Sequence, residues 1–157
     1  MNYHKFIFLG LIVATSLCLS WSCSKTAIHN DEVTYLALGD SYTICQSVEP
    51  EKRWPIQLQE KLNSQGLSVQ TPKIVAKTGW RTDNLLAAAK KEIKNDKYDL
   101  VSLLIGVNNE FQGQSPQSFE PQFIESLEYA IKHCNNGTRG VFVVSIPDYG
   151  FTPYGSS

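Results

Sequence analysis

The stretch VTYLALGDS, residues 33–41, decides the fold of this 157-residue chain. Residues 33–38 are mainly β-branched, aromatic and aliphatic, which predicts a short strand. Gly39 permits a tight exit from that strand, and Ser41 stands where the next helical turn would begin. Because a strand that leads directly into a helix is the first half of a βαβ unit, the stretch indicates an α/β protein.

Three further strands are predicted, at residues 69–76, 100–105 and 141–146. The last two are near-continuous apolar runs, as expected of strands covered on both faces by helices. Pro72 interrupts the run at 69–76. Since proline cannot donate to a strand ladder, this strand is expected at an edge of the sheet.

Helical patterns fill the intervals between the predicted strands. The first has apolar residues at i, i+4 and i+8, with proline in its first turn and glycine after its end: Trp54, Leu58, Leu62, Pro55 and Gly66. A second helix has Thr82 or Asp83 as its cap, with an apolar stripe of Leu85, Leu86, Ala89 and Ile93. A third runs over about residues 118–134, with one apolar face of Phe123, Ile124, Leu127 and Ile131.

This alternation predicts a three-layer α/β/α, flavodoxin-like fold with a parallel sheet of strand order 2-1-3-4. The usual order, 2-1-3-4-5, has a fifth strand that the sequence does not supply. Strands one and three are neighbours whose connections leave in opposite directions. They open a crevice beyond their carboxyl ends, where such sheets bind ligands.

Composition fits one globular domain with one core, since 42% of the residues are hydrophobic and 18% are charged. The formal net charge of -1 provides no basic field that would attract nucleic acid or an anionic membrane surface. No nucleic-acid partner is therefore expected.

Three polar motifs follow the first three strands. They are Gly39-Asp40-Ser41, Thr78-Gly79-Trp80 and Gly106-Val107-Asn108-Asn109. Each alone also suits an ordinary turn or cap. Because each falls at the carboxyl end of a successive strand, however, a serine hydroxyl, a glycine N–H and an asparagine amide are expected to converge on one crevice.

These motifs resemble the first three sequence blocks of the SGNH hydrolases, the GDSL-type serine esterase and lipase family. The flanking stretches 40–44, 53–55 and 145–150 also resemble those of bacterial lysophospholipase-like esterases. The resemblance implies that Ser41 is the acylated nucleophile. It implies an oxyanion hole formed by the backbone N–H of Ser41, that of Gly79 and the side chain of Asn108, with no cofactor.

Two positions near these blocks stand outside the family pattern. The family usually has Asp after the asparagine of its third block, and Asn109 stands there in this chain. Asp40 is not the acid of the catalytic triad, and its expected role is to shape the turn. Cys45 does not belong to the pattern, and no histidine is placed for it by sequence.

The resemblance also implies a catalytic Asp and His from a C-terminal Asp-x-x-His block, which the 157 residues do not contain. The three histidines, His4, His29 and His133, lack an aspartate three positions earlier. His133 is expected near a helix C-terminus, as a favourable cation there. The simplest interpretation is a C-terminally truncated and nearly inactive SGNH domain.

The N-terminal residues resemble an export signal. A mostly apolar run at 6–19 is too short for a confident membrane span, and Ser22 precedes Cys23 as in a lipoprotein signal. We expect a signal peptide at 1–22, acylation of Cys23, a tether at 23–31 and the domain at 32–157. The alternative is a secretory signal cleaved nearby. Both predict export, and the first also predicts a lipid anchor at Cys23 as the membrane contact, facing the periplasm or the cell surface.

The mature chain would keep Cys45 and Cys134, which could pair or stay free. No Cys-x-x-Cys or histidine cluster predicts a metal site. The first functional hypothesis is a serine esterase acting on a small ester substrate: a lysophospholipid, a short acyl ester or a carbohydrate acetyl ester. The alternative is a non-catalytic exported lipoprotein that binds a small ligand or glycan in the crevice. A nucleotide or flavin binder is not supported, because no glycine-rich phosphate loop follows the first strand.

Overall fold

The structure, a computed structural model, describes residues 32–152. The expected signal peptide at 1–22, the acylation site Cys23 and the tether at 23–31 lie outside the described residues. So do the last five positions of the expected domain, 153–157.

Four parallel strands form one sheet in the order β2-β1-β3-β4. They are β1 (Tyr35–Gly39), β2 (Lys73–Ala76), β3 (Leu100–Leu104) and β4 (Val141–Val143). This confirms the order 2-1-3-4 predicted from the sequence and the edge position of the strand that follows Pro72.

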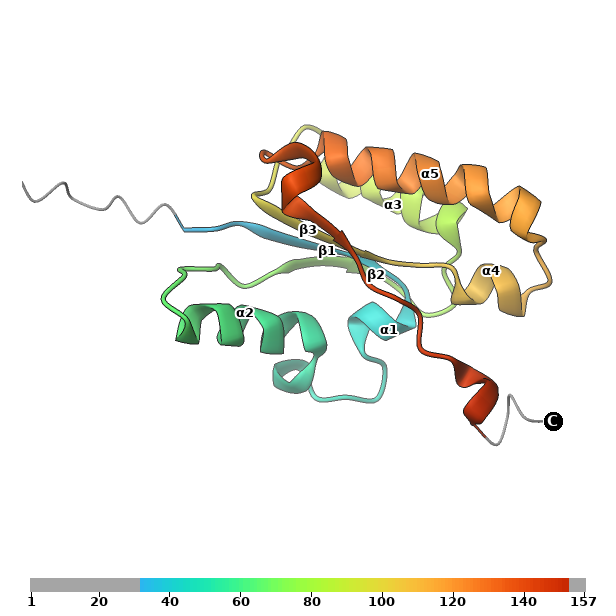
Figure 1. Cartoon of the computed structure of the whole chain (residues 1–157), viewed down its shortest axis with the longest axis horizontal. Coiled ribbons are helices and arrows are strands. Elements are labelled where there is room, and N and C mark those ends of the chain that lie inside the picture. The colour runs from blue at the N-terminus through green and yellow to red at the C-terminus, as the bar shows by residue number, and fades with distance from the viewer. Residues whose placement is uncertain (1–31, 153–157) are drawn as a thin grey trace, which may run out of the picture.

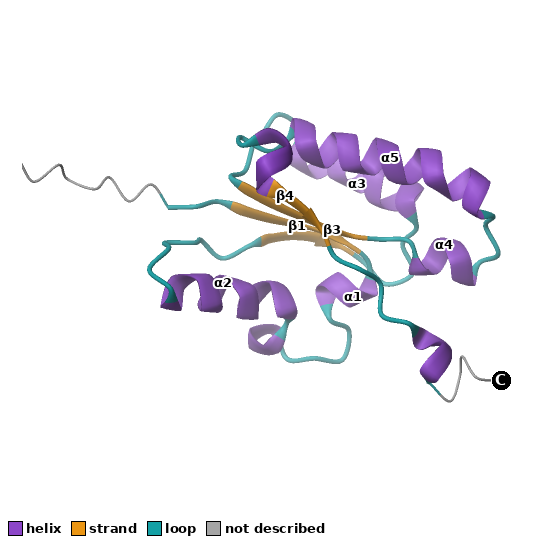
Figure 2. Ribbon diagram, in the orientation of Figure 1, coloured by secondary structure: helices purple, strands orange, loops and turns teal. Residues whose placement is uncertain are grey.

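Helices cover both faces of the sheet, which gives three layers (Figure 1). On one face lie α3 (Thr82–Ile93) and α5 (Pro116–Lys132), and on the other α1 (Ser41–Ile44) and α2 (Trp54–Ser64). Figure 2 shows the short helix α4 (Val107–Phe111) beyond the end of the sheet. Single 3-10 turns lie at Pro50–Lys52, Gly137–Gly140 and Tyr149–Phe151.

The strand β1 is buried along its whole length because it contributes side chains to two apolar clusters. Leu36 and Leu38 pack in the larger cluster with α3 and α5 residues. Tyr35 and Ala37 pack in the smaller one, against Leu58 and other partly buried residues. The period of two along a strand sends alternate residues to opposite faces, so β1 holds both helical layers to the sheet.

Several predicted boundaries differ from the structure. The second strand begins at Lys73 rather than 69, because Pro72 precedes it and Val69 makes only an isolated bridge to Val33. The fourth ends at Val143 rather than 146.

The predicted helix details also need correction. The cap of α3 is Arg81, whose N–H donates to Asn84 Oδ1, and Thr82 is already helical. Helix α5 begins at Pro116 after the cap Ser115. Its predicted apolar face is confirmed in part: Phe123 and Leu127 pack against the core, whereas Ile124 is 46% exposed and Ala130 is fully buried.

Gly39 lies where β1, α1 and the end of β3 meet most closely. A Cβ atom there would lie 1.9 Å from Thr43 Oγ1 and 2.5 Å from the carbonyl oxygen of Leu104. Both contacts are too short, and the second involves backbone that cannot rotate away. The glycine therefore lets the Ser41 turn sit directly against the sheet.

Gly39→Ala is expected to lower the free energy of unfolding by about 2 kcal/mol or more, because an overpacked core must shift backbone atoms. Urea unfolding followed by circular dichroism measures it. Gly150→Ala is the control, with an expected change within about 0.5 kcal/mol, because the nearest atom there is an exposed aspartate side chain. Equal losses in the two variants would contradict the packing argument.

Candidate active site

The segments after β1, β2 and β3 leave the sheet at the same end, where the carboxyl ends of the strands lie. Gly39 pairs with Ala76 on one side and with Leu104 on the other, so the carboxyl ends of the three strands are in register. Ser41, Gly79 and Asn108 each follow one of these ends within a few residues. The sheet register thus brings the three predicted motifs to a common rim.

Ser41 is the first residue of α1 and is half-buried. Asp40 caps this helix, since its Oδ1 accepts from the N–H of Tyr42 at 2.9 Å. The indole of Trp54 donates to the carbonyl oxygen of Tyr42 at 3.0 Å, which ties the turn to α2. These contacts hold Ser41 at a short, fixed turn beyond β1.

Ser41 and Asn108 line one pocket of about 270 Å³. Its remaining lining residues are Tyr42, Val107, Phe111, Tyr149 and Thr152. Asn108 lies on α4, and its Nδ2 donates to the carbonyl oxygen of Trp80 at 2.9 Å. That bond uses one of the two amide hydrogens, so the group retains a second donor.

Gly79 lies in the loop after β2 and has φ +80, a conformation that favours glycine. It is not among the residues that line the pocket of Ser41 and Asn108. Its loop is tied to both neighbours: Thr78 Oγ1 donates to Gln46 Oε1 at 2.8 Å, and Asn108 reaches Trp80. The structure therefore brings Ser41 and Asn108 together and places Gly79 beside Asn108.

Asn109 is a site-supporting residue that sequence reasoning noted only as a departure from a pattern. It is 1% exposed. Its Oδ1 accepts from the N–H of Thr82, and its Nδ2 donates to Thr82 Oγ1 at 2.8 Å and to Gln114 Oε1 at 2.6 Å. Both its amide oxygen and its amide nitrogen are thus used to join α4 to the start of α3. Only its place directly after Asn108 could have indicated this role.

Asp40 is fully buried, and its Oδ2 has no hydrogen-bond partner. Burial raises the pKa of this carboxyl from 3.8 to about 6, against the opposing effect of the bond from the Tyr42 N–H. As the cap of α1, Asp40 shapes the turn in which Ser41 lies.

The buried Asp40 predicts a pH-dependent stability. Because its pKa is higher in the folded state, its stabilisation is complete below about pH 4 and is lost as pH rises through about 6. The loss relative to Asp40→Asn is expected to reach about 3 kcal/mol at neutral pH, from about 1.4 kcal/mol per pKa unit. Urea unfolding of both proteins between pH 4 and 8 measures it, and a pH-independent difference between them would contradict the assignment.

His133 lies at the amino ends of the strands, whereas Ser41 lies beyond their carboxyl ends. It is the C-cap of α5, and its carbonyl oxygen accepts from the N–H of Tyr98, before β3 begins. The ring is buried, contacts the carbonyl oxygen of Asp96 at 2.8 Å and stacks on Tyr129. It is the one histidine in residues 32–152, so no described imidazole lies near Ser41.

Both described cysteines are free thiols. Cys134 is buried near His133, whereas Cys45 follows α1 and accepts at Sγ from the N–H of Trp54 at 3.4 Å. Cys45 also lines a pocket of about 510 Å³, together with Ser41 and Val48. The sequence left pairing of the two cysteines open, and the structure shows them apart.

Neither a metal cluster nor a membrane span is found in the part of the chain that the structure describes. No three histidine, cysteine or acidic side chains gather there as ligands for an ion. None of the helices within 32–152 has the length and apolar character needed to cross a bilayer.

Residues 37–157 match the GDSL-like lipase/acylhydrolase family. A search of curated proteins finds no match. Among solved structures, the fold is similar to that of TesA, with a TM-score of 0.62 and 19% identity over 77% of this chain and 65% of that one.

Two further structures have the same fold. AlinE4, an SGNH-hydrolase family esterase, has a TM-score of 0.63 and 20% identity over 73% of this chain and 59% of its own. The psychrotrophic esterase EstA from Pseudoalteromonas sp. has a TM-score of 0.59 and 17% identity, over 80% and 66% of the two chains. The chain therefore spans from 59% to 66% of the length of these three proteins.

Proposed function

The chain belongs to the GDSL-like lipase/acylhydrolase family, and we propose that the protein hydrolyses carboxylic esters through an acyl intermediate on Ser41. The observation that supports this most is the shared pocket of Ser41 and Asn108. A serine hydroxyl and an amide donor on one small cavity are the two groups that acyl transfer needs: one attacks the carbonyl carbon and the other stabilises its oxygen.

In the proposed reaction the Ser41 Oγ attacks the ester carbonyl, and the alcohol leaves as the acyl-serine forms. Water then releases the acid and restores the serine. The oxyanion is stabilised by the second Nδ2 hydrogen of Asn108, with the N–H groups of Ser41 and Gly79 as the other donors. Gly79 suits this role because no atom lies within 4 Å of the position where its Cβ would be.

A serine of this kind also needs a base, which the family takes from an Asp-x-x-His block. His133 lies at the amino ends of the strands and therefore cannot serve as a base for Ser41. We propose that residues 1–157 alone hydrolyse esters slowly. A general acid or base contributes roughly 10² to 10⁴ in rate, and binding and oxyanion stabilisation remain without it.

The proposed substrates are small esters: lysophospholipids, short acyl esters or acetyl groups on carbohydrates. Val107 and Phe111 give the Ser41 pocket an apolar wall, which suits an acyl group, and the chemistry needs no cofactor. From the sequence alone, we also propose export as a lipoprotein acylated at Cys23.

The proposal is tested with 4-nitrophenyl acetate and added imidazole as an external base. The difference in hydrolysis rate between the wild-type chain and Ser41→Ala is expected to rise with imidazole concentration, because imidazole can then take the Ser41 proton. Mass spectrometry is expected to find an acetyl group on the peptide that contains Ser41. Identical rates in both proteins at every imidazole concentration would remove Ser41 from the chemistry.

The placement of His133 also supports a second candidate, a non-catalytic protein that binds a small ligand or glycan in the same crevice. This candidate predicts that Ser41→Ala leaves ligand affinity and the imidazole-dependent rate unchanged. The same pair of proteins therefore separates the two functions.

A further inference from the structure

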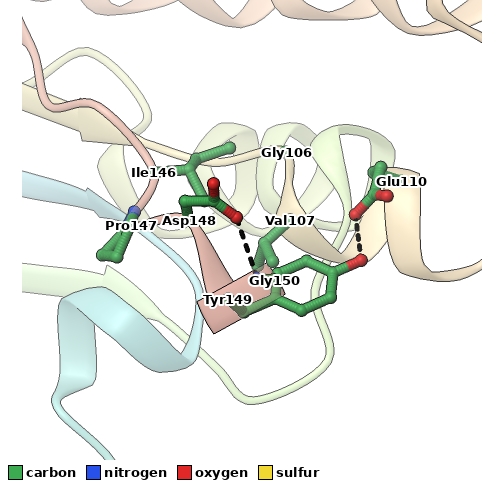
Figure 3. Close-up of a pocket in the computed structure, with 8 residues that line it drawn as sticks. All are labelled: Gly106, Val107, Glu110, Ile146, Pro147, Asp148, Tyr149 and Gly150. Atoms are coloured by element: carbon green, nitrogen blue, oxygen red, sulfur yellow. Dashed lines mark hydrogen bonds between the residues drawn. The ribbon is translucent and has the colours of Figure 1, made fainter. Parts of the chain in front are cut away.

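A second pocket adjoins the pocket of Ser41 and Asn108. Its volume is about 410 Å³, against about 270 Å³ for the first. Val107 and Tyr149 line both pockets, whereas Ser41 and Asn108 line the smaller one and not the larger. Tyr149 thus lies on the boundary between the proposed reaction centre and the larger pocket. Figure 3 shows the residues that line the larger pocket.

The Tyr149 ring is held on this boundary by contacts on two segments. Its hydroxyl donates to Glu110 Oε2 on α4, two positions beyond Asn108. Its own 3-10 turn is capped by Asp148, whose Oδ1 accepts from the N–H of Gly150 at 2.8 Å. Figure 3 shows both bonds. The ring therefore has a defined position although it belongs to the segment after β4.

The charge of the larger pocket restricts what it can hold. Glu110 and Asp148 line it, none of the lysines and arginines within 32–152 does, and Ile146 and Pro147 add apolar surface. A phosphate or carboxylate group would meet two like charges there, whereas an alkyl chain or an ammonium group would not.

We propose that Tyr149 is a specificity-determining residue that separates the two pockets, so that the larger one admits the outer part of an extended, neutral or cationic ester arm only when the ring is removed. That the ligand is an ester rests on the proposed function, whereas the separation of the two pockets by Tyr149 concerns binding and does not depend on catalysis. With the ring in place, the arm on this side of Ser41 is confined to the smaller pocket. Without it, the two cavities become one groove within the range of roughly 300 to 1,000 Å³ typical of small-molecule sites.

The kinetic test uses two ester series in the imidazole assay: 4-nitrophenyl esters from acetyl to octanoyl, and acetate esters of alcohols of increasing length. Tyr149→Ala is expected to raise the ratio of octanoyl to acetyl kcat/KM, or the matching ratio for the alcohols, by about tenfold or more. Which series responds identifies the arm. Glu110→Ala, which frees the hydroxyl but keeps the ring, should shift the same ratio less. It also provides a second variant if Tyr149→Ala does not fold.

Phe151→Ala is the matched control, because Phe151 is 90% exposed, lies two residues beyond Tyr149 and lines neither pocket. It is expected to keep the wild-type ratio. An unchanged ratio in both Tyr149→Ala and Glu110→Ala, in both series, would overturn the proposal.

A binding test on the full chain does not depend on catalysis. Calorimetry compares octyltrimethylammonium with octyl sulfate, which share a chain and differ in charge. Tyr149→Ala should bind the ammonium probe more tightly than the wild type does, and about tenfold more tightly than it binds the sulfate. If binding changes in this way but no hydrolysis depends on Ser41, the proposed function fails and the separation stands. Hydrolysis that depends on Ser41, with unchanged ratios and affinities, overturns the separation alone.

Discussion

Asn109→Ala is expected to lower the free energy of unfolding by about 3 kcal/mol, because it leaves the buried N–H of Thr82 without its acceptor and removes two further hydrogen bonds, to Thr82 Oγ1 and Gln114 Oε1. Asn109 is 1% exposed, and its side chain makes three hydrogen bonds. The midpoint of thermal unfolding should fall by roughly 10 °C. Urea and thermal denaturation followed by circular dichroism measure the two quantities.

The adjacent residue provides the control for this prediction. Asn108 is half-buried and makes one described side-chain bond, to Trp80, so Asn108→Ala should cost about 1 kcal/mol. A loss of stability as large for Asn108→Ala as for Asn109→Ala would contradict the assignment of the structural role to Asn109.

Asn108→Ala is expected to lower the Ser41-dependent rate of ester hydrolysis by a factor of roughly 10² to 10³, the usual effect of removing one oxyanion donor. Because the developing negative charge exists only in the transition state, kcat and kcat/KM should fall together while KM stays nearly constant. Steady-state kinetics with 4-nitrophenyl acetate and imidazole measure both parameters.

Gln112→Ala is the matched control, since it also removes a side-chain amide and follows α4 directly, but it does not line the Ser41 pocket. Its rate should stay within about threefold of wild type. A rise in KM alone for Asn108→Ala would instead assign this residue to substrate binding and leave the oxyanion to other groups.

The strand order could be predicted from the sequence because each strand carries a strong local signal. The apolar runs at β1 and β3, the edge proline before β2 and the helical stripe of α3 each follow from one-dimensional periodicity. The stripe residues Leu85, Leu86, Ala89 and Ile93 are all buried as expected. These elements can be predicted because they are largely buried, and buried segments can be recognised in a sequence by their apolar residues.

The face of α5 was predicted only in part: Phe123 and Leu127 pack against the core, but Ile124 does not, for a physical reason. Helix α5 packs on α3 and β3 through small residues, Ser126 and Ala130, which allow a close approach. A search for large apolar residues therefore selects Ile124, which faces outward. The contacting helix, and not the periodicity alone, decides which face is buried.

At the candidate site, the sequence predicted the shared rim of Ser41, Gly79 and Asn108 from their positions after strands. It did not predict the helix α4, the network of Asn109 or the place of Tyr149. Those depend on contacts between segments that are far apart in the chain: Thr82 with Asn109, and Glu110 with Tyr149. No local pattern encodes such pairs.

The register that aligns Gly39 with Ala76 and Leu104 also separates the molecule into two ends with different tolerance to change. The exposed turn at 94–97 and the loop at 135–139 lie at the amino ends of β3 and β4, across the sheet from Ser41. Extra residues inserted into the exposed turn would lengthen a connection without moving the residues that follow the carboxyl ends of the strands. An affinity tag or reporter domain inserted there is therefore expected to leave the proposed reaction centre undisturbed, so that protein engineers could modify that end independently.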